Sequence, residues 1–95
     1  MTRPHSECKV GFRPITKEFC PVGGKDKANG TVEVSREEVE TLRLKNLQGL
    51  CQTSAAKRMG ISQSTFQRML ATTYRKVSDA LVRGKNIKIV EHKNK

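Results

Sequence analysis

The chain has 95 residues and a formal net charge of +10, from 19 Lys and Arg against 9 Asp and Glu. A domain of this size buries only about 60 to 65% of its unfolded surface, which argues against a large internal active site. With no apolar run of about 18 residues and no signal-peptide pattern, we expect a soluble, cytoplasmic protein whose basic excess favours nucleic acid or an anionic membrane surface as partner.

The positive charge is concentrated in the second half of the chain. Residues 1–30 carry 6 basic and 3 acidic side chains, residues 31–50 carry 3 and 4, and residues 51–95 carry 10 and 2. The respective net charges are +3, −1 and +8. We therefore expect a polyanion-binding surface in the last of these segments.

Residues 1–30 are predicted to form an irregular N-terminal arm. They contain all three prolines and the polar segment GGKDKANG, which is typical of a loop or linker. Phe12 and Phe19 are the candidate anchors of this arm, and disorder is the alternative.

The arm also holds His5, Cys8 and Cys20, whose imidazole and thiol groups are potential zinc or iron ligands. His5-x-x-Cys8 has no matching second pair, so ordinary thiols in a loop are the better interpretation, and we expect no metal or other cofactor. Cys51 stands at a predicted helix start, where the helix dipole can lower a thiol pKa and favour oxidant sensing. A plain cap or core thiol is the simpler interpretation of Cys51.

A strand and a helix are predicted next. The segment TVEVS alternates apolar and polar residues as a short strand does. Ser35 and Glu38 have the spacing of a capping box, in which each side chain accepts a hydrogen bond from the other residue's backbone N–H. The helix that begins here has Val39 and Leu42 as its first inward residues and ends near Asn46 to Gly49.

Two further helices and a strand follow. A short helix is predicted from about Gln52 to Met59, and Gly60 can end it in the left-handed conformation. Ser62 is a good N-cap for a third helix that meets no Gly or Pro before Gly84, so this helix has about 20 residues and a length of about 30 Å. The segment NIKIVE alternates like a strand that pairs with TVEV of its own or a partner chain. Residues 91–95 form a basic tail.

The second and third helices have the spacing of a helix-turn-helix. This motif requires small residues where the helices cross, a flexible residue in the turn, and apolar residues that fix the crossing angle. Ala55 and Ala56 meet the first requirement and Gly60 meets the second. The apolar residues are Met59, Ile61, Phe66 and Met69.

The third helix separates into two faces at about 100° per residue. Its predicted core side consists of Phe66, Leu70, Thr73, Val77 and Leu81. The opposite, outward side consists of Ser64, Arg68, Ala71 and Arg75, with Gln67 at the flank.

The outward residue types suit the major groove of DNA, where Arg can donate to guanine, Gln can pair with adenine, and small side chains permit close approach. The predicted base contacts are Gln63, Ser64, Gln67 and Arg68. The predicted phosphate contacts, which fix the register without reading sequence, are Lys57, Arg58, Thr65, Arg75 and Lys76. A plain helical hairpin with a solvated basic surface is the alternative interpretation.

A resemblance follows from the motifs LRLKNLQGL, AAKRMGIS, TFQR and ALVRGK, together with RP and FCPVG nearer the start. They are similar to those of a family of small, mostly uncharacterised prokaryotic proteins predicted to bind DNA through a sigma-factor-like helix-turn-helix. The resemblance covers roughly residues 3–89 and implies a sigma-region-four-like or winged-helix-like domain with a role in transcription regulation. It also implies DNA contact by Gln63, Ser64, Thr65, Gln67 and Arg68. Three positions depart from the family pattern. Cys51 stands in place of a Ser-like cap, Ser54 in place of an acid and Gln63 in place of an Arg, so the resemblance implies no target sequence.

We therefore expect a mainly α fold, in which a sigma-region-four-like, three-helix domain spans residues 31–90 with a long third helix and short flanking strands. The expected function is sequence-specific binding of double-stranded DNA. A homodimer is expected because one short recognition helix rarely supplies enough contacts, and the C-terminal strand is the candidate dimer contact. RNA polymerase is a further candidate partner.

The alternative function is a protein-interaction adaptor that uses the same basic helical face, with an N-terminal arm that senses metal or redox state. RNA binding is disfavoured because one Tyr and three Phe leave little for base stacking. The sequence has no paired carboxylates, nucleophile elbow or phosphate loop, so we expect no enzymatic activity.

Overall fold

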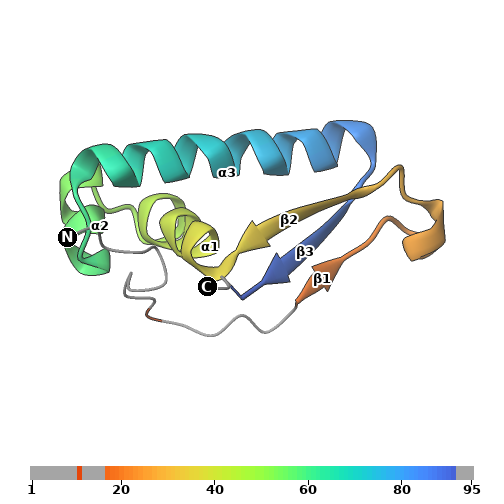
Figure 1. Cartoon of the computed structure of the whole chain (residues 1–95), viewed down its shortest axis with the longest axis horizontal. Helices are drawn as coiled ribbons and strands as arrows, with labels where there is room; N and C mark the ends of the chain where they lie inside the picture. The colour runs from red at the N-terminus through yellow and green to blue at the C-terminus, as the bar shows by residue number, and fades with distance from the viewer. Residues whose placement is uncertain (1–10, 12–16, 92–95) are drawn as a thin grey trace.

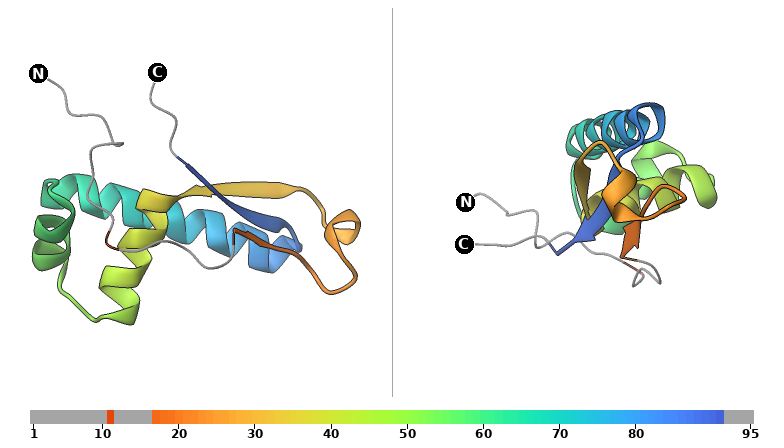
Figure 2. Two further views of the ribbon diagram at one scale, coloured as in Figure 1. Left: turned by 90° about the horizontal axis from the view of Figure 1, so that it is seen from below. Right: turned by 90° about the vertical axis from the view of Figure 1, so that its right-hand side faces the viewer.

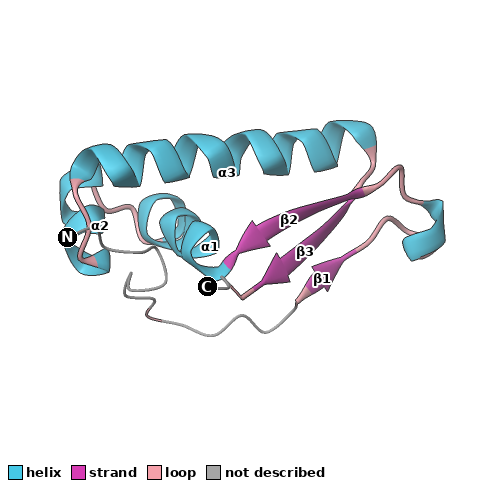
Figure 3. Ribbon diagram, in the orientation of Figure 1, coloured by secondary structure: helices cyan, strands magenta, loops and turns pink. Residues whose placement is uncertain are grey.

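The computed structural model describes Gly11 and residues 17–91. Its helices and strands are, in chain order, β1 (Glu18–Phe19), β2 (Thr31–Ser35), α1 (Arg36–Leu42), α2 (Gln52–Met59), α3 (Gln63–Arg83) and β3 (Asn86–Val90). A 3-10 turn, η2 (Lys25–Lys27), lies between β1 and β2, and a π-helical turn, η3 (Arg43–Leu47), continues α1. The described part of the chain is thus mainly helical with a long third helix and a small sheet, as predicted (Figure 3).

Helix α3 runs along the length of the molecule, and the other elements lie along one side of it (Figure 1). Helices α1 and α2 pack on its first half, and strand β2 packs beside its second half. Within the described ranges, no helix combines the length and the apolar composition that crossing a membrane requires.

The three strands form one sheet in the order β1-β3-β2. Strand β3 is parallel to β2, with Val32 opposite Ile87, and antiparallel to β1, with Phe19 opposite the same Ile87. The predicted pairing of the C-terminal strand with TVEV therefore occurs within one chain. Strand β3 lies between β2 and the two-residue strand β1, and its role as the dimer contact stays a prediction.

Strand β1 lies in the predicted N-terminal arm, which is largely irregular elsewhere in its described part. The expectation that the Phe19 side chain anchors the arm is wrong, since this side chain is 53% exposed and the backbone of β1 makes the attachment instead. Phe12 lies outside the described residues.

The predicted helix ends are confirmed. The Glu38 N–H donates to Ser35 Oγ at 3.1 Å and the Ser35 N–H donates to Glu38 Oε1 at 2.9 Å, which completes the capping box of α1. Gly60 and Gly84 end α2 and α3 with φ angles of 71° and 70°, where glycine avoids the steric cost of a Cβ. The Ser62 hydroxyl caps the start of α3.

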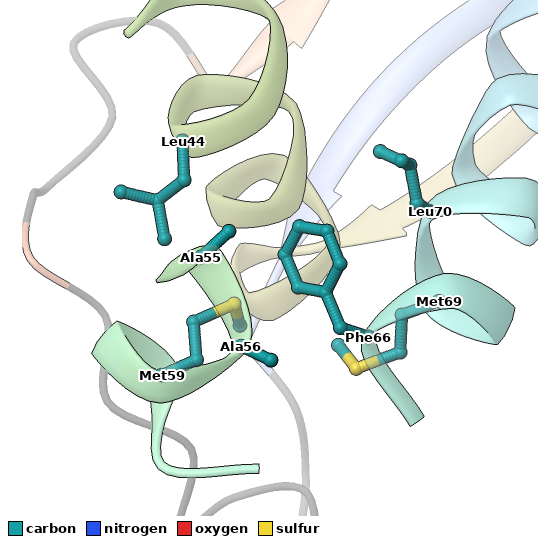
Figure 4. Close-up of a cluster of buried hydrophobic side chains, with 7 residues drawn as sticks. All are labelled: Leu44, Ala55, Ala56, Met59, Phe66, Met69 and Leu70. Carbon is teal, nitrogen blue, oxygen red and sulfur yellow. The ribbon is translucent and has the colours of Figure 1, made fainter. Parts of the chain in front are cut away.

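The apolar core joins α2 and the first half of α3 to the end of the first helical segment. Phe66 is fully buried and points toward the alanines of α2 (Figure 4). The cluster consists of Leu44, Ala55, Ala56, Met59, Phe66, Met69 and Leu70, with Leu42, Leu50 and Ile61 packed against it. The residues predicted to fix the α2–α3 crossing angle are thus buried or, for Ile61, half-buried.

The predicted core side of α3 is correct only in part. Phe66, Leu70 and Thr73 are buried and Val77 is half-buried, but Leu81 is 75% exposed. The prediction for Leu81 is wrong because α3 extends beyond α1 and α2, and beyond that point the sheet covers the side of α3 that bears Ala80 instead.

The predicted inward face of α1 is correct only in part. Leu42 is half-buried and packs against the apolar core, but the buried residues of the helix are Glu37, Glu40 and Thr41, and Val39 is half-buried outside the core cluster. Burial of the Glu40 carboxylate is tolerated because the Arg43 guanidinium donates to it at 2.7 and 3.0 Å and the Gly11 N–H donates at 3.0 Å. Helix α1 therefore leaves Val39 and part of Leu42 accessible at the surface.

Candidate nucleic-acid interface

The unit formed by α2, a short turn and α3 presents one exposed face. The turn is tight because the Ile61 N–H donates to the Ala56 carbonyl at 3.1 Å and the Gly60 N–H donates to the Lys57 carbonyl at 3.1 Å. Since the apolar side chains of both helices point into the core, the polar side chains at the start of α3 point outward.

The four predicted base contacts lie together on the first two turns of α3, and all four are exposed. Gln63 accepts a hydrogen bond from the Thr53 hydroxyl at 3.4 Å, and the Ser64 hydroxyl lies 3.3 Å from that of Ser62. Gln67 and Arg68 make no side-chain hydrogen bond or ion pair with any described residue. Their donors and acceptors are therefore available to a ligand.

The five predicted phosphate contacts differ in availability. Lys57, Arg58 and Arg75 are exposed, and within residues 17–91 none of them forms an ion pair. Thr65 is half-buried, and its hydroxyl accepts from Ser62 at 2.9 Å. The predicted phosphate contact Lys76 already donates to both carboxylate oxygens of one glutamate, as described next.

Sequence reasoning missed two carboxylates beside α3, those of Glu33 and Glu38. Lys76 Nζ lies 2.8 and 3.1 Å from the Glu38 carboxylate oxygens, and this pair forms part of an open pocket of about 500 Å³. Glu33 of β2 lines the same pocket, as do Thr65 and Arg68. The alternation in β2 indicates that Glu33 is exposed, but no local signal places it next to α3. Since Glu38 is paired with Lys76, Glu33 is the carboxylate of this pocket that has no ion-pair partner among the described residues.

The cysteines provide no built metal site in the described residues. Cys20 is exposed, no cluster of three potential ligands occurs in the described ranges, and His5 and Cys8 lie outside them. Cys51 is exposed at the start of α2, where its Sγ lies 3.4 Å from the Ser54 hydroxyl. The hydrogen bond with Ser54 lowers the pKa of the Cys51 thiol below its ordinary value, and backbone hydrogen bonds at the helix start add to this effect.

Comparison with known proteins gives relatives that carry the name UPF0251 protein. The chain is 40% identical over 88 residues to one of Halothermothrix orenii, 42% over 89 residues to one of Caldicellulosiruptor bescii and 41% over 87 residues to one of Methanosarcina mazei. These matches cover 93%, 94% and 92% of this chain but only 65%, 61% and 53% of the relatives, so the chain spans about half to two thirds of their length. No solved structure matches it. The model of the family described as protein of unknown function DUF134 matches residues 1–94, and the chain belongs to this family.

Proposed function

We propose that the chain binds double-stranded DNA through the exposed face of α2 and the first half of α3, and that it acts in transcription regulation. One observation carries this proposal. Helices α2 and α3 expose cationic side chains that have no ion-pair partner among the described residues, together with exposed amide and hydroxyl groups at the start of α3; these cations are Lys57, Arg58, Arg68 and Arg75. A polyanion neutralises such charges and displaces their counterions, which favours binding.

The positions of the residues on the helices suggest which of them contact bases and which contact phosphates. The major groove, about 12 Å wide, admits a single helix. On the first turns of α3, Ser64 and Arg68 point away from the core, and Gln63 and Gln67 are exposed at the flank. Lys57 and Arg58 at the end of α2 flank these residues and suit the phosphate backbone. The free N–H groups at the start of α3 add an attraction for a phosphate.

The charges beside α3 favour one side for the phosphate backbone. Glu33, which has no ion-pair partner among the described residues, would repel a phosphate placed next to it on the sheet side of α3, so the backbone is expected to follow the side that bears α2. Lys76 takes no part in the proposed contact because Glu38 already holds its ammonium group.

Selection of bound sequences from a random duplex library, followed by titration of the selected and a random duplex, tests this proposal. Arg68→Ala should weaken binding to the selected duplex by about 1 to 3 kcal/mol, with a smaller loss on the random duplex. Lys57→Ala should weaken both alike and reduce the salt slope by about 1. Lys27→Ala, which removes an exposed cation from η2, is the matched control and should change neither the affinity for the two duplexes nor the salt slope.

Two results would contradict parts of the proposal. An equal loss on both duplexes for Arg68→Ala would remove the base-reading role of Arg68. Absence of salt-dependent affinity for any duplex would reject DNA binding altogether and favour the rival function, an adaptor that docks on a regulator or RNA polymerase through the same helices.

A further inference from the structure

A second exposed surface lies between the first helical segment and the second half of α3. Helix α1 and η3 project sideways from α3, so that the two segments form an angle (Figure 2, left). The aliphatic side chains that α1 and η3 leave at the surface line a shallow pocket of about 410 Å³, formed by Val39, Leu42, Arg43, Asn46 and Leu47. We call this pocket, together with Tyr74 and Leu81 of α3, the apolar corner.

A hydrogen-bonded pair joins the two sides of the apolar corner. The Tyr74 hydroxyl donates to Asn46 Oδ1 at 3.0 Å, and the Asn46 amide donates back to the Tyr74 oxygen at 2.8 Å. Leu81 follows Tyr74 by seven residues, so the two side chains leave α3 within about 20° of each other and about 10 Å apart along the helix. The pair thus links the pocket to the side of α3 on which Leu81 lies.

This surface exposes large aliphatic side chains to solvent. Leu47 and Leu81 are 81% and 75% exposed, and Val82, next to Leu81 at the end of α3, is 83% exposed. Grouped apolar side chains of this kind mark contact sites rather than ordinary solvated surface.

We propose that the apolar corner is the contact between two copies of this chain. Copies that each carry a net charge of +10 repel one another, so they must meet where no uncompensated charge lies. The corner meets this condition, because Arg43 is the one charged residue lining its pocket among those described and Glu40 holds its guanidinium at 2.7 Å. Among the described residues, the pocket lining therefore offers a charged partner no unpaired charge.

The shape of the corner also fits a two-fold contact. An isologous interface requires that the same surface both inserts and receives. The pocket of α1 and η3 can receive a side chain, and Leu81, 75% exposed, lies on the side of α3 that Tyr74 links to this pocket. In the proposed dimer the end of α3 of each copy therefore occupies the pocket of the other copy.

If the chain binds DNA as proposed above, this arrangement also places the DNA contacts of the two copies at a distance that suits two successive major grooves. If two α3 helices cross antiparallel near Ser78, each Gln67 lies eleven residues, or about 17 Å, from the crossing point. The two Gln67 residues are then up to about 33 Å apart, close to the roughly 34 Å between successive major grooves on one side of DNA.

Sedimentation equilibrium of the 95-residue chain without DNA tests the contact, over a range of concentrations. The unchanged chain should have twice its own mass at high concentration. Leu81→Glu and Leu47→Glu should each raise the dimer dissociation constant by about 100-fold or more, since a symmetric interface holds the new carboxylate twice. Val22→Glu places the same carboxylate on a fully exposed aliphatic residue outside the corner and should leave the dimer intact.

All three sites are at least 75% exposed, so the variants should fold, and circular dichroism melting curves verify this. A monomeric unchanged chain at every concentration would overturn the proposal. A dimer that survives both corner variants, or that Val22→Glu weakens equally, would overturn it as well. Loss of DNA binding with an intact corner dimer would reject the proposed function and leave this inference standing.

Discussion

Glu38 has two structural roles that substitutions can separate. Its Oε1 atom accepts from the Ser35 N–H at 2.9 Å and so closes the capping box of α1. Its carboxylate also accepts from Lys76 Nζ at 2.8 and 3.1 Å, which ties α1 to α3. Glu38→Gln retains an amide oxygen for the capping box but removes the ion pair, whereas Glu38→Ala removes both.

The structure sets the size of each loss. The Lys76 side chain is 35% exposed, so solvent screens the ion pair and its loss should cost about 0.5 to 1 kcal/mol. Loss of the capping interaction should cost a further 0.5 to 2 kcal/mol or so. We therefore expect the free energy of unfolding to fall by about 0.5 to 1 kcal/mol in Glu38→Gln and by about 1 to 3 kcal/mol in Glu38→Ala.

Urea denaturation followed by circular dichroism measures these differences, and Lys76→Met completes a double-mutant cycle with Glu38→Gln. Equal destabilisation by Gln and Ala would refute the contribution of the capping box. Strict additivity of Lys76→Met and Glu38→Gln would refute the ion pair. Under the proposed function, Glu38→Gln also releases Lys76, so DNA affinity should rise and its salt slope should steepen by about 1.

Two further predictions follow from perturbed ionisable groups. A hydrogen bond from Lys85 holds the pKa of Asp79 below its ordinary value, so the interaction stabilises the fold at neutral pH and is lost as pH falls from about 4 through the lower folded pKa. Asp79→Asn should accordingly lower Tm at neutral pH but not in strong acid, and an equal loss at both would contradict this. Because Ser54 lowers the pKa of Cys51, Ser54→Ala should raise the pH midpoint of Cys51 alkylation followed by mass spectrometry, and an unchanged midpoint would exclude this cause.

Features that depend on residues within one helical turn could be predicted from the sequence. The capping box at Ser35, the left-handed ends at Gly60 and Gly84, and the Ser62 cap each arise from backbone groups only a few residues away. The core of the α2–α3 unit could also be predicted, because small and apolar residues at this spacing have few other ways to be buried. The exposed position of the four candidate base contacts follows from the same pattern.

Features that depend on distant partners could not be predicted. Periodicity shows which residues share a helix face, but not whether another element covers that face, so Leu81 appeared to be a core residue. The carboxylates of Glu37 and Glu40 made the buried side of α1 look like its solvent side, and the compensation of Glu40 by Arg43 and the Gly11 N–H is visible only in three dimensions. The position of Glu33 next to α3 and the two-residue strand β1 likewise have no local signal.

The length of α3 connects the two surfaces proposed for this chain. Its 21 residues extend about 30 Å, whereas the major groove is about 12 Å wide, so a helix that enters the groove by its first turns must leave its second half outside the DNA. That second half is where Tyr74, Leu81 and Val82 are exposed. Because α3 contains no Gly or Pro, it transmits the geometry of the apolar corner to Gln67 and Arg68 without a hinge. The distance between paired DNA contacts would therefore be set by the rigid helix itself rather than by a flexible linker.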